Sequence, residues 1–200
     1  MAENCPPGTY SPETTDSSAS YNCLPCPLNY FCPKWGMNAN DVNWASGSPS
    51  ADYRCPAGYE CLSGAIHQSN VDDVTMRLCP VGYRCDFATD GVASQACGLG
   101  YYNPRQGQAA CAPCIAGFTC SEQGLEYPLP CPRGSYCVDL ASVAYDVSLQ
   151  TVPCPAGTYS SEEYLTAEAQ CQDCPPGKYC EIGASTFTGL CSEGYICTGG

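Results

Sequence analysis

The apolar positions of this chain follow neither a helical pattern nor the alternation of long β-strands. Helical spacing is limited to a single turn at residues 162–168, and the chain has no uninterrupted apolar run of roughly 18 residues. Cysteines and aromatic residues instead form short clusters that polar spacers separate. These clusters predict short β-hairpins, turns and irregular loops with little helix.

The clusters recur along the chain. The spacing cysteine, five residues, cysteine occurs seven times, at Cys26/Cys32, Cys55/Cys61, Cys79/Cys85, Cys114/Cys120, Cys131/Cys137, Cys174/Cys180 and Cys191/Cys197. Three of these pairs follow a longer arm, which runs from Cys5 to Cys23, from Cys97 to Cys111 and from Cys154 to Cys171. Because these pairs and arms use all 20 cysteines, we interpret the chain as an extended repeat protein whose modules contact mainly their sequence neighbours.

The modules fall into four groups. A long module and an insertion occupy residues 1–54, two short modules 55–96, a long and a short module 97–153, and a second such pair 154–200. The spacers between modules differ from one another in sequence, as at 36–44 and 139–145, and we interpret them as insertions. The fold class that we expect is a small disulfide-rich repeat protein.

Most modules open with Cys-Pro-x-Gly and an aromatic residue close behind, as at 5–10 and 154–159. This string predicts a tight turn in which proline takes the second position and glycine the fourth. We expect the aromatic ring to lie over a disulfide and to supply most of the apolar burial. The excess of Tyr (15) over Phe (4) fits that role, since the Tyr hydroxyl can stay near water.

The string Cys-Pro-x-Gly-Thr-Tyr, followed by a Cys-x-x-Cys-Pro-x-Gly restart, resembles the ephrin-receptor-like cysteine-rich repeats. The resemblance covers nearly the whole chain. Modules of this family occur in receptor ectodomains, in protist surface proteins and in the flagellar fibres called mastigonemes. The resemblance therefore implies a module type, and the function has to be argued separately.

Composition indicates the compartment in which the protein folds and disfavours some classes of binding partner. One cysteine in ten residues is typical of secreted scaffolds that fold in an oxidising environment, so we expect an extracellular protein, secreted or on the cell surface. The net charge of −13 disfavours nucleic acid and anionic membranes as partners, and we expect no membrane insertion. Residues 1–20 lack the pattern of a signal peptide, which predicts a mature or excised segment in which Met1 is not a natural start.

The sequence favours a non-enzymatic role without a metal or other cofactor. The Cys-x-x-Cys pairs suit zinc or redox chemistry in other contexts, but the secreted composition favours structural disulfides here. His67 is the only histidine, so we interpret it as a solvated loop residue and not as a catalytic base. The acid pairs Asp72-Asp73 and Glu162-Glu163 lack the ligand pattern of a calcium loop, and we expect them on the solvated surface.

The cysteine spacing allows two patterns of pairing. In the sequential pattern, every short pair closes on itself and every long arm closes from its first cysteine to its last, because a Pro-x-Gly turn brings such ends within disulfide reach. In an interlocked pattern, cysteines bridge successive modules, for instance Cys32 to Cys55. We expect the sequential pattern, with stability distributed over the modules.

Two functions fit these features. The first is a structural protein, a segment or subunit of a glycosylated, mastigoneme-like surface fibre that associates with itself or with neighbouring modules. The alternative is a receptor or adhesion ectodomain whose loops at 36–54 and 62–78 bind a protein ligand. The chain has no Asn-x-Ser/Thr triplet, and the candidates for O-linked glycans are Ser11, Thr14, Thr15, Ser17, Ser18, Ser46, Ser48 and Ser50.

Overall fold

The computed structural model describes residues 4–12, 23–39, 41–42, 53–66, 76–86, 94–192 and 197. The described chain consists of short antiparallel strand pairs and a few 3-10 turns, so the expected disulfide-rich array of hairpins is confirmed. The pairs are β1 (Thr9–Tyr10) with β2 (Leu24–Pro25), β3 (Tyr59–Cys61) with β4 (Met76–Leu78), β5 (Tyr83–Arg84) with β6 (Gln95–Ala96), β7 (Tyr101–Tyr102) with β8 (Ala112–Pro113), β9 (Phe118–Thr119) with β10 (Leu129–Pro130), β11 (Ser135–Cys137) with β12 (Thr151–Pro153), β13 (Thr158–Tyr159) with β14 (Gln172–Asp173) and β15 (Lys178–Tyr179) with β16 (Gly189–Leu190). The 3-10 helices are η2 (Leu140–Val143), η3 (Val147–Leu149) and η4 (Glu168–Gln170).

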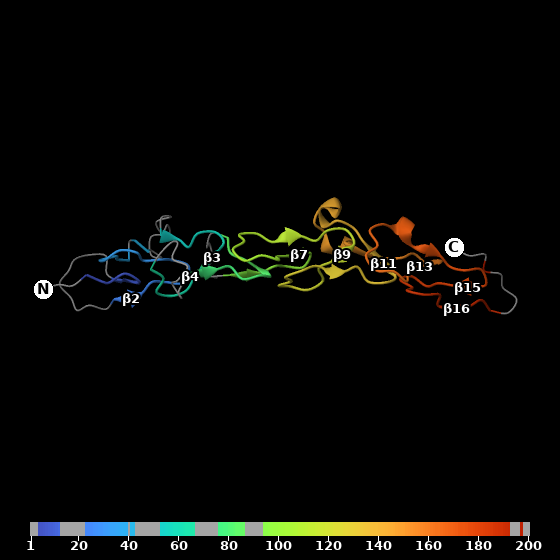
Figure 1. Ribbon diagram of the computed structural model, residues 1–200, viewed down its shortest axis with the longest axis horizontal. Helices are drawn as coiled ribbons and strands as arrows, with labels where there is room; N and C mark the ends of the chain where they lie inside the picture. The colour runs from blue at the N-terminus through green and yellow to red at the C-terminus, as the bar shows by residue number, and fades with distance from the viewer. Residues whose placement is uncertain are drawn as a thin grey trace. The chain divides into compact units, whose positions relative to one another are not determined.

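The chain divides into two compact units. The first comprises residues 1–96 and 103–111, and the second comprises residues 97–102 and 112–200. Within each unit the strand pairs follow one another in chain order, as the colour sequence in Figure 1 shows.

Each module is built on a seven-residue loop, which we call a knuckle and name by its opening cysteine. Its last position is the closing residue, a cysteine in short modules. In the Cys154 knuckle the N–H of Thr158 donates to the carbonyl of Pro155 at 3.1 Å, and Gly157 has a φ of +89°. Proline is thus first and glycine third in the turn, so the predicted register was wrong by one residue. The reason is that the third position of a type II turn requires a positive φ, which glycine adopts at little cost.

One knuckle keeps this geometry without glycine. In the Cys26 knuckle, Asn29 takes the third turn position with a φ of +69°, and Tyr30 N–H still donates to Pro27 O at 3.2 Å. Asparagine is among the few other residues that enter the left-handed region readily. The departure from the repeat at this point therefore changes the residue and leaves the turn intact.

The strand pairs all share one register. The two residues after the glycine of a knuckle pair with the two residues before the next opening cysteine. In the Cys154 knuckle, Thr158 pairs with Asp173 and Tyr159 pairs with Gln172, directly before Cys174. Because the register is constant, spacers of different length all return the chain to an equivalent position.

Four further backbone hydrogen bonds join a knuckle to the next one, and we call this set, together with the strand pair, a step. From the Cys154 to the Cys174 knuckle they are Gly157 N to Cys180 O (2.9 Å), Cys174 N to Gly157 O (2.8 Å), Gly183 N to Cys154 O (2.8 Å) and Ser160 N to Ala184 O (3.0 Å). From the Cys131 to the Cys154 knuckle they are Gly134 N to Ser160 O (2.9 Å), Cys154 N to Gly134 O (2.8 Å), Tyr164 N to Cys131 O (3.2 Å) and Cys137 N to Leu165 O (2.8 Å). Neighbouring modules are therefore joined by a repeating backbone pattern that does not depend on the spacer sequence.

The beginning of each spacer belongs to this pattern, which corrects the interpretation of the spacers as insertions. Gly36 N–H donates to Cys5 O and Gly64 N–H donates to Cys26 O, each at 2.8 Å. We call such a residue, nine or ten positions after an opening cysteine, the tail residue. The predicted helical turn at 162–168 was wrong for the same reason, because the tail residue Tyr164 donates to Cys131 O and only η4 is helical.

Two small clusters of buried side chains lie in the first unit. One contains Phe31, Cys55, Cys61, Ala65 and Met76, with Tyr53 and Tyr59 against it; the other contains Cys26, Cys32, Met37 and Val42, with Tyr10, Tyr30 and Tyr53 against it. Tyrosines pack against both clusters, and each cluster contains cysteines. Phenylalanine, methionine, valine and alanine share the burial, so tyrosine does not supply most of it.

Candidate functional site

All 20 cysteines are disulfide-bonded. The bonds are Cys5–Cys23, Cys26–Cys32, Cys55–Cys61, Cys79–Cys85, Cys114–Cys120, Cys131–Cys137, Cys154–Cys171, Cys174–Cys180 and Cys191–Cys197, and Cys97 and Cys111 are bonded as well. These bonds follow the sequential pattern, and Cys32 and Cys55 are bonded within their own knuckles rather than to each other.

The bridges are of two kinds. A short bridge, such as Cys174–Cys180, closes a knuckle on itself. A long bridge, such as Cys154–Cys171, joins an opening cysteine to the position three residues before the next opening cysteine, and it therefore fastens one step covalently. The two members of the Cys171/Cys174 pair bond to different partners, so this Cys-x-x-Cys does not form the reactive bridge of a redox motif.

Long modules have a polar closing residue where short modules have a cysteine. Ser160 is 2% exposed; its hydroxyl donates to Glu162 O at 3.0 Å and accepts from Glu162 N at 3.2 Å. Asn103 is also buried and donates from Nδ2 to Tyr83 O. Sequence reasoning missed this role, although the signal was present: the sixth residue after the opening cysteine is Ser or Asn in every long module, Ser11 included.

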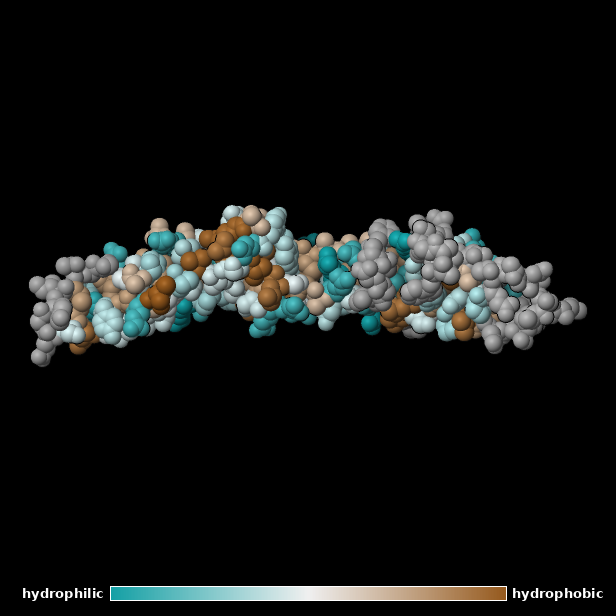
Figure 2. Space-filling model, turned by 180° about the vertical axis from the view of Figure 1, so that it is seen from behind, coloured by the Kyte–Doolittle hydropathy of each residue, from teal (hydrophilic) through white to brown (hydrophobic). Residues whose placement is uncertain are grey.

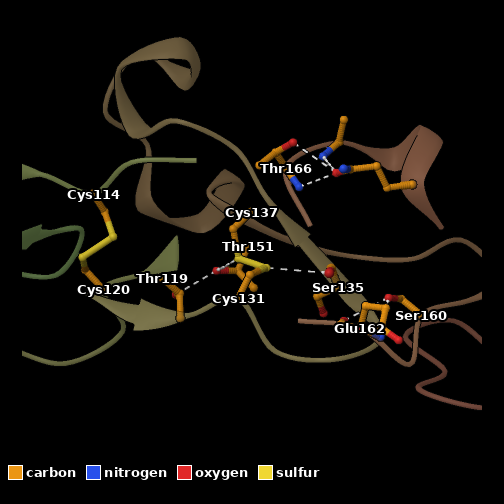
Figure 3. Close-up of a disulfide and its surroundings, with 12 residues drawn as sticks. Cys114, Thr119, Cys120, Cys131, Ser135, Cys137, Thr151, Ser160, Glu162 and Thr166 are labelled. Carbon is orange, nitrogen blue, oxygen red and sulfur yellow. Dashed lines mark hydrogen bonds between the residues drawn. A yellow bond between two sulfur atoms is a disulfide. The ribbon is translucent and has the colours of Figure 1, made fainter. Parts of the chain in front are cut away.

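A threonine pair lies beside the Cys131–Cys137 bridge, as Figure 3 shows. Thr151 from β12 lies with its hydroxyl oxygen 3.6 Å from Cys137 Sγ and 2.9 Å from the hydroxyl oxygen of Thr119 in β9. This contact ties strands from successive modules together through side chains, in addition to the backbone bonds of the steps.

The segment 138–150 departs most from the repeat. It holds η2 and η3, and each is capped by an aspartate: Asp139 accepts from Ala141 N at 2.9 Å, and Asp146 accepts from Ser148 N at 3.0 Å and from the Ser148 hydroxyl at 2.6 Å. The bonds from Ser148 lower the pKa of Asp146 below its ordinary value. Leu140 is fully buried and anchors the segment in the second unit.

The outer side of this segment presents apolar side chains to solvent. Tyr145 is 56% exposed and Leu149 is 51% exposed. Figure 2 shows hydrophobic residues, in brown, on the bulge that the segment forms. Ala144 and Tyr145 both have positive φ values, which places the exposed ring at a sharply defined bend.

Most of the residues that the sequence analysis weighed for glycans, catalysis or metal binding lie outside the described residues: Thr14, Thr15, Ser17, Ser18, Ser46, Ser48, Ser50, His67, Asp72 and Asp73. Ser11 is half-buried, and its N–H donates to Met37 O at 2.8 Å. Glu163 lies 3.6 Å from Arg133, at the surface. In the part of the chain that the structure describes, no group of three or more His, Cys, Asp or Glu side chains could hold a metal ion.

No family model and no curated protein matches the chain, so the comparisons with known proteins assign it to no family. Among the described residues, no helix is both long and apolar enough to cross a membrane. The density of disulfides is typical of proteins that fold in an oxidising compartment.

Proposed function

We propose that this chain is a non-enzymatic structural protein outside the cell, a disulfide-bonded repeat segment or subunit of a surface fibre or coat of the mastigoneme-like kind. The observation that carries the proposal is the step. The same backbone bonds and the same strand register join module to module, whatever the spacer contains. In such a fold most residues serve the stacking of one module on the next, and stacks of this kind are suited to assembly.

Two further observations support a structural role over catalysis. Disulfides fix the short knuckles in one conformation, and the side chains of the buried polar residues Ser160 and Asn103 are occupied by hydrogen bonds to backbone carbonyls. The one histidine is His67, so a His-dependent catalytic group would have to be built around that single residue. O-linked glycans on the Ser/Thr/Pro-rich spacers and the ephrin-receptor-like character of the modules are parts of this proposal.

Electron microscopy of the native material, with size-exclusion chromatography of the isolated chain, tests the proposal. We expect filaments or ordered layers in the native material and concentration-dependent association of the chain. A chain that stays monomeric at high concentration, and that labels no filament or coat in its source, would refute the structural role. Intact mass measured before and after removal of O-glycans tests the glycan part separately.

A second candidate function, a protein-binding ectodomain, is favoured by the segment 138–150. This segment is ordered by two aspartate caps and a buried leucine, yet it exposes Tyr145 and Leu149, and exposed aromatic residues on well-ordered bends are typical of recognition sites. A monomeric chain whose Tyr145→Ala variant loses binding to the source cell surface would favour this function. A Tyr127→Ala variant, which removes another exposed tyrosine outside this segment, is the matched control.

A further inference from the structure

We propose that the chain is an extensible load-bearing element, in which strand pairs without a long bridge open under tension while strand pairs closed by a long bridge hold. The proposal rests on the structural role above, since a fibre or coat carries load. It follows from the placement of the two kinds of bridge relative to the hydrogen bonds of the steps.

The bridges determine which residues are extended when the chain is pulled. A force transmitted along the chain passes from Cys174 directly to Cys180 through the sulfur atoms, so the five residues between them cannot be extended. In the long module the force passes from Cys154 to Cys171. Residues 155–170, which include strand β13 and the closing residue Ser160, are therefore shielded from load.

Only the chain between bridges can lengthen. In the second unit these stretches are 121–130, 138–153 and 181–190, whereas just two residues, 172–173, separate Cys171 from Cys174. The longer stretches are held by backbone hydrogen bonds and small side-chain contacts, each worth about 1 kcal/mol net. Tension breaks such contacts long before a covalent bond, so the strand pair after the Cys131 knuckle opens, whereas the strand pair after the Cys154 knuckle is held by the Cys154–Cys171 bridge.

The steps that can open differ in strength. The stretch 181–190 ends in a two-residue pair, and its Ile182 and Leu190 are 68% and 73% exposed, so little apolar area resists its release. The stretch 138–153 ends in a three-residue pair and includes the fully buried Leu140. Its Thr151 also contacts Thr119. We therefore expect 181–190 to open at lower force than 138–153.

Opening of this kind is reversible, because the knuckles survive it. Each short knuckle keeps its turn and its bridge, the Cys154 knuckle stays inside the Cys154–Cys171 bridge, and the hydrogen bonds of an opened step join modules that follow one another in the chain. Repeat folds with such contacts between neighbouring modules re-form module by module when the load falls.

Single-molecule force spectroscopy on the full chain, held by handles at its two ends, tests the proposal. Each released residue adds roughly 3.3–3.6 Å, so release of 138–153 lengthens the molecule by up to about 55 Å, and that of 181–190 by up to about 35 Å. We expect discrete events of these sizes and a total released length that does not include residues 155–170. A single rupture without intermediate events, or release of 155–170 in the oxidised chain, would overturn the proposal.

Two double variants sharpen the measurement. Cys154→Ser with Cys171→Ser exposes the shielded stretch to load and adds up to about 55 Å of released length, whereas the control Cys174→Ser with Cys180→Ser adds only about 17 Å. Should either variant fail to fold, dithiothreitol added to the wild-type chain under constant force gives the same lengthening in steps. Equal gains from the two bridges would contradict the proposal. Because the force experiment pulls a single chain, a negative result would refute the extensible element without refuting the fibre. Microscopy of the native material tests the fibre separately.

Discussion

The Cys131 and Cys174 knuckles of the second unit have the same opening, Cys-Pro-x-Gly, and the same left-handed glycine, yet their glycines meet different surroundings. A β-carbon on Gly134 would collide with the carbonyl oxygen of Gly183, the tail residue of the module after next. A β-carbon on Gly177 meets no described atom within 4 Å. The shared signature thus reflects the turn, and in the Cys131 knuckle the contact with a tail residue two modules later makes glycine a spatial requirement as well.

The first unit repeats the crowded arrangement. A β-carbon on Gly8 would lie 2.8 Å from Gly64 O, and one on Gly58 would collide with Gly107 O. In both cases the facing carbonyl belongs to the tail residue two modules later in the chain. Contacts therefore extend beyond the nearest neighbour, which refines the expectation that modules touch mainly their sequence neighbours.

The largest effect that we predict is that of Gly134→Ala. Alanine at a φ of +78° costs about 1 kcal/mol, and forcing the carbonyl of Gly183 away adds about 1–3 kcal/mol more. We expect the free energy of local opening to fall by about 3 kcal/mol, as measured by amide hydrogen exchange of the step between the Cys131 and Cys154 knuckles. In Gly177→Ala, with a φ of +78° and open space, the loss should be about 1 kcal/mol. Equal losses of stability in the two variants would show that the contact between Gly134 and the carbonyl of Gly183 does not matter.

The other side of the same contact should be more tolerant. Gly183 contributes its carbonyl to the clash, while its own β-carbon would lie 3.4 Å from Pro153, an ordinary contact distance. Gly183→Asn should therefore cost about 1 kcal/mol or less, because asparagine enters the left-handed region and nothing has to move. Hydrogen exchange at Cys154 and Gly183 checks this, and a loss as large as that of Gly134→Ala would contradict it.

Sequence reasoning reached the repeat, the hairpins and the sequential bridges because covalent closure of short loops is a local matter. It placed the turn one residue early, since proline suits the second turn position in general, whereas here its carbonyl is the acceptor of the turn. It missed the tail residues because their pattern is interrupted: Gly36, Gly64 and Gly183 share it, but Leu140 and Tyr164 replace glycine. Tyr164 keeps a φ of +66°, so the left-handed backbone persists there without glycine, whereas Leu140 does not have a positive φ.

The candidate site was less predictable than the fold. Ser160 and Asn103 are ordinary polar residues in the sequence, and their burial arises only when the next module packs on them. The order of 138–150 depends on Asp139 and Asp146 as caps, which no periodicity reveals. Features that depend on contacts between modules cannot be predicted from the sequence of one module.

A smaller effect separates turn geometry from packing in the Cys26 knuckle. Asn29 is buried, has a φ of +69°, and its Nδ2 lacks a described hydrogen-bond partner. We expect Asn29→Gly to change stability by no more than about 0.5 kcal/mol, since it relieves both costs and loses some packing. Asn29→Ala should cost about 1 kcal/mol, because alanine is less tolerant of positive φ. Hydrogen exchange at Asn29 and Cys55 measures both variants, and the reverse order would show that packing of the asparagine side chain outweighs the turn.

The smallest predicted effect concerns charge at the Cys131 knuckle. Burial raises the pKa of Tyr136 above its ordinary value of 10.0, and the negative charge of Glu168 and a hydrogen bond to its side chain raise it further. The fold therefore favours the neutral phenol, so this contribution to stability is fully present below about pH 10 and is lost as the pH rises through the higher pKa of the folded protein. Glu168→Gln should move the pKa of Tyr136 back toward 10.0. The measurement is an ultraviolet absorbance titration of each protein, from which the titration of the same protein carrying Tyr136→Phe is subtracted to isolate the signal of Tyr136. Glu163→Gln removes a carboxylate that lies next to Arg133 instead, and it should leave the pKa of Tyr136 unchanged. Equal shifts in the two variants would mean that the overall negative charge of the chain, and not Glu168, acts on this tyrosine.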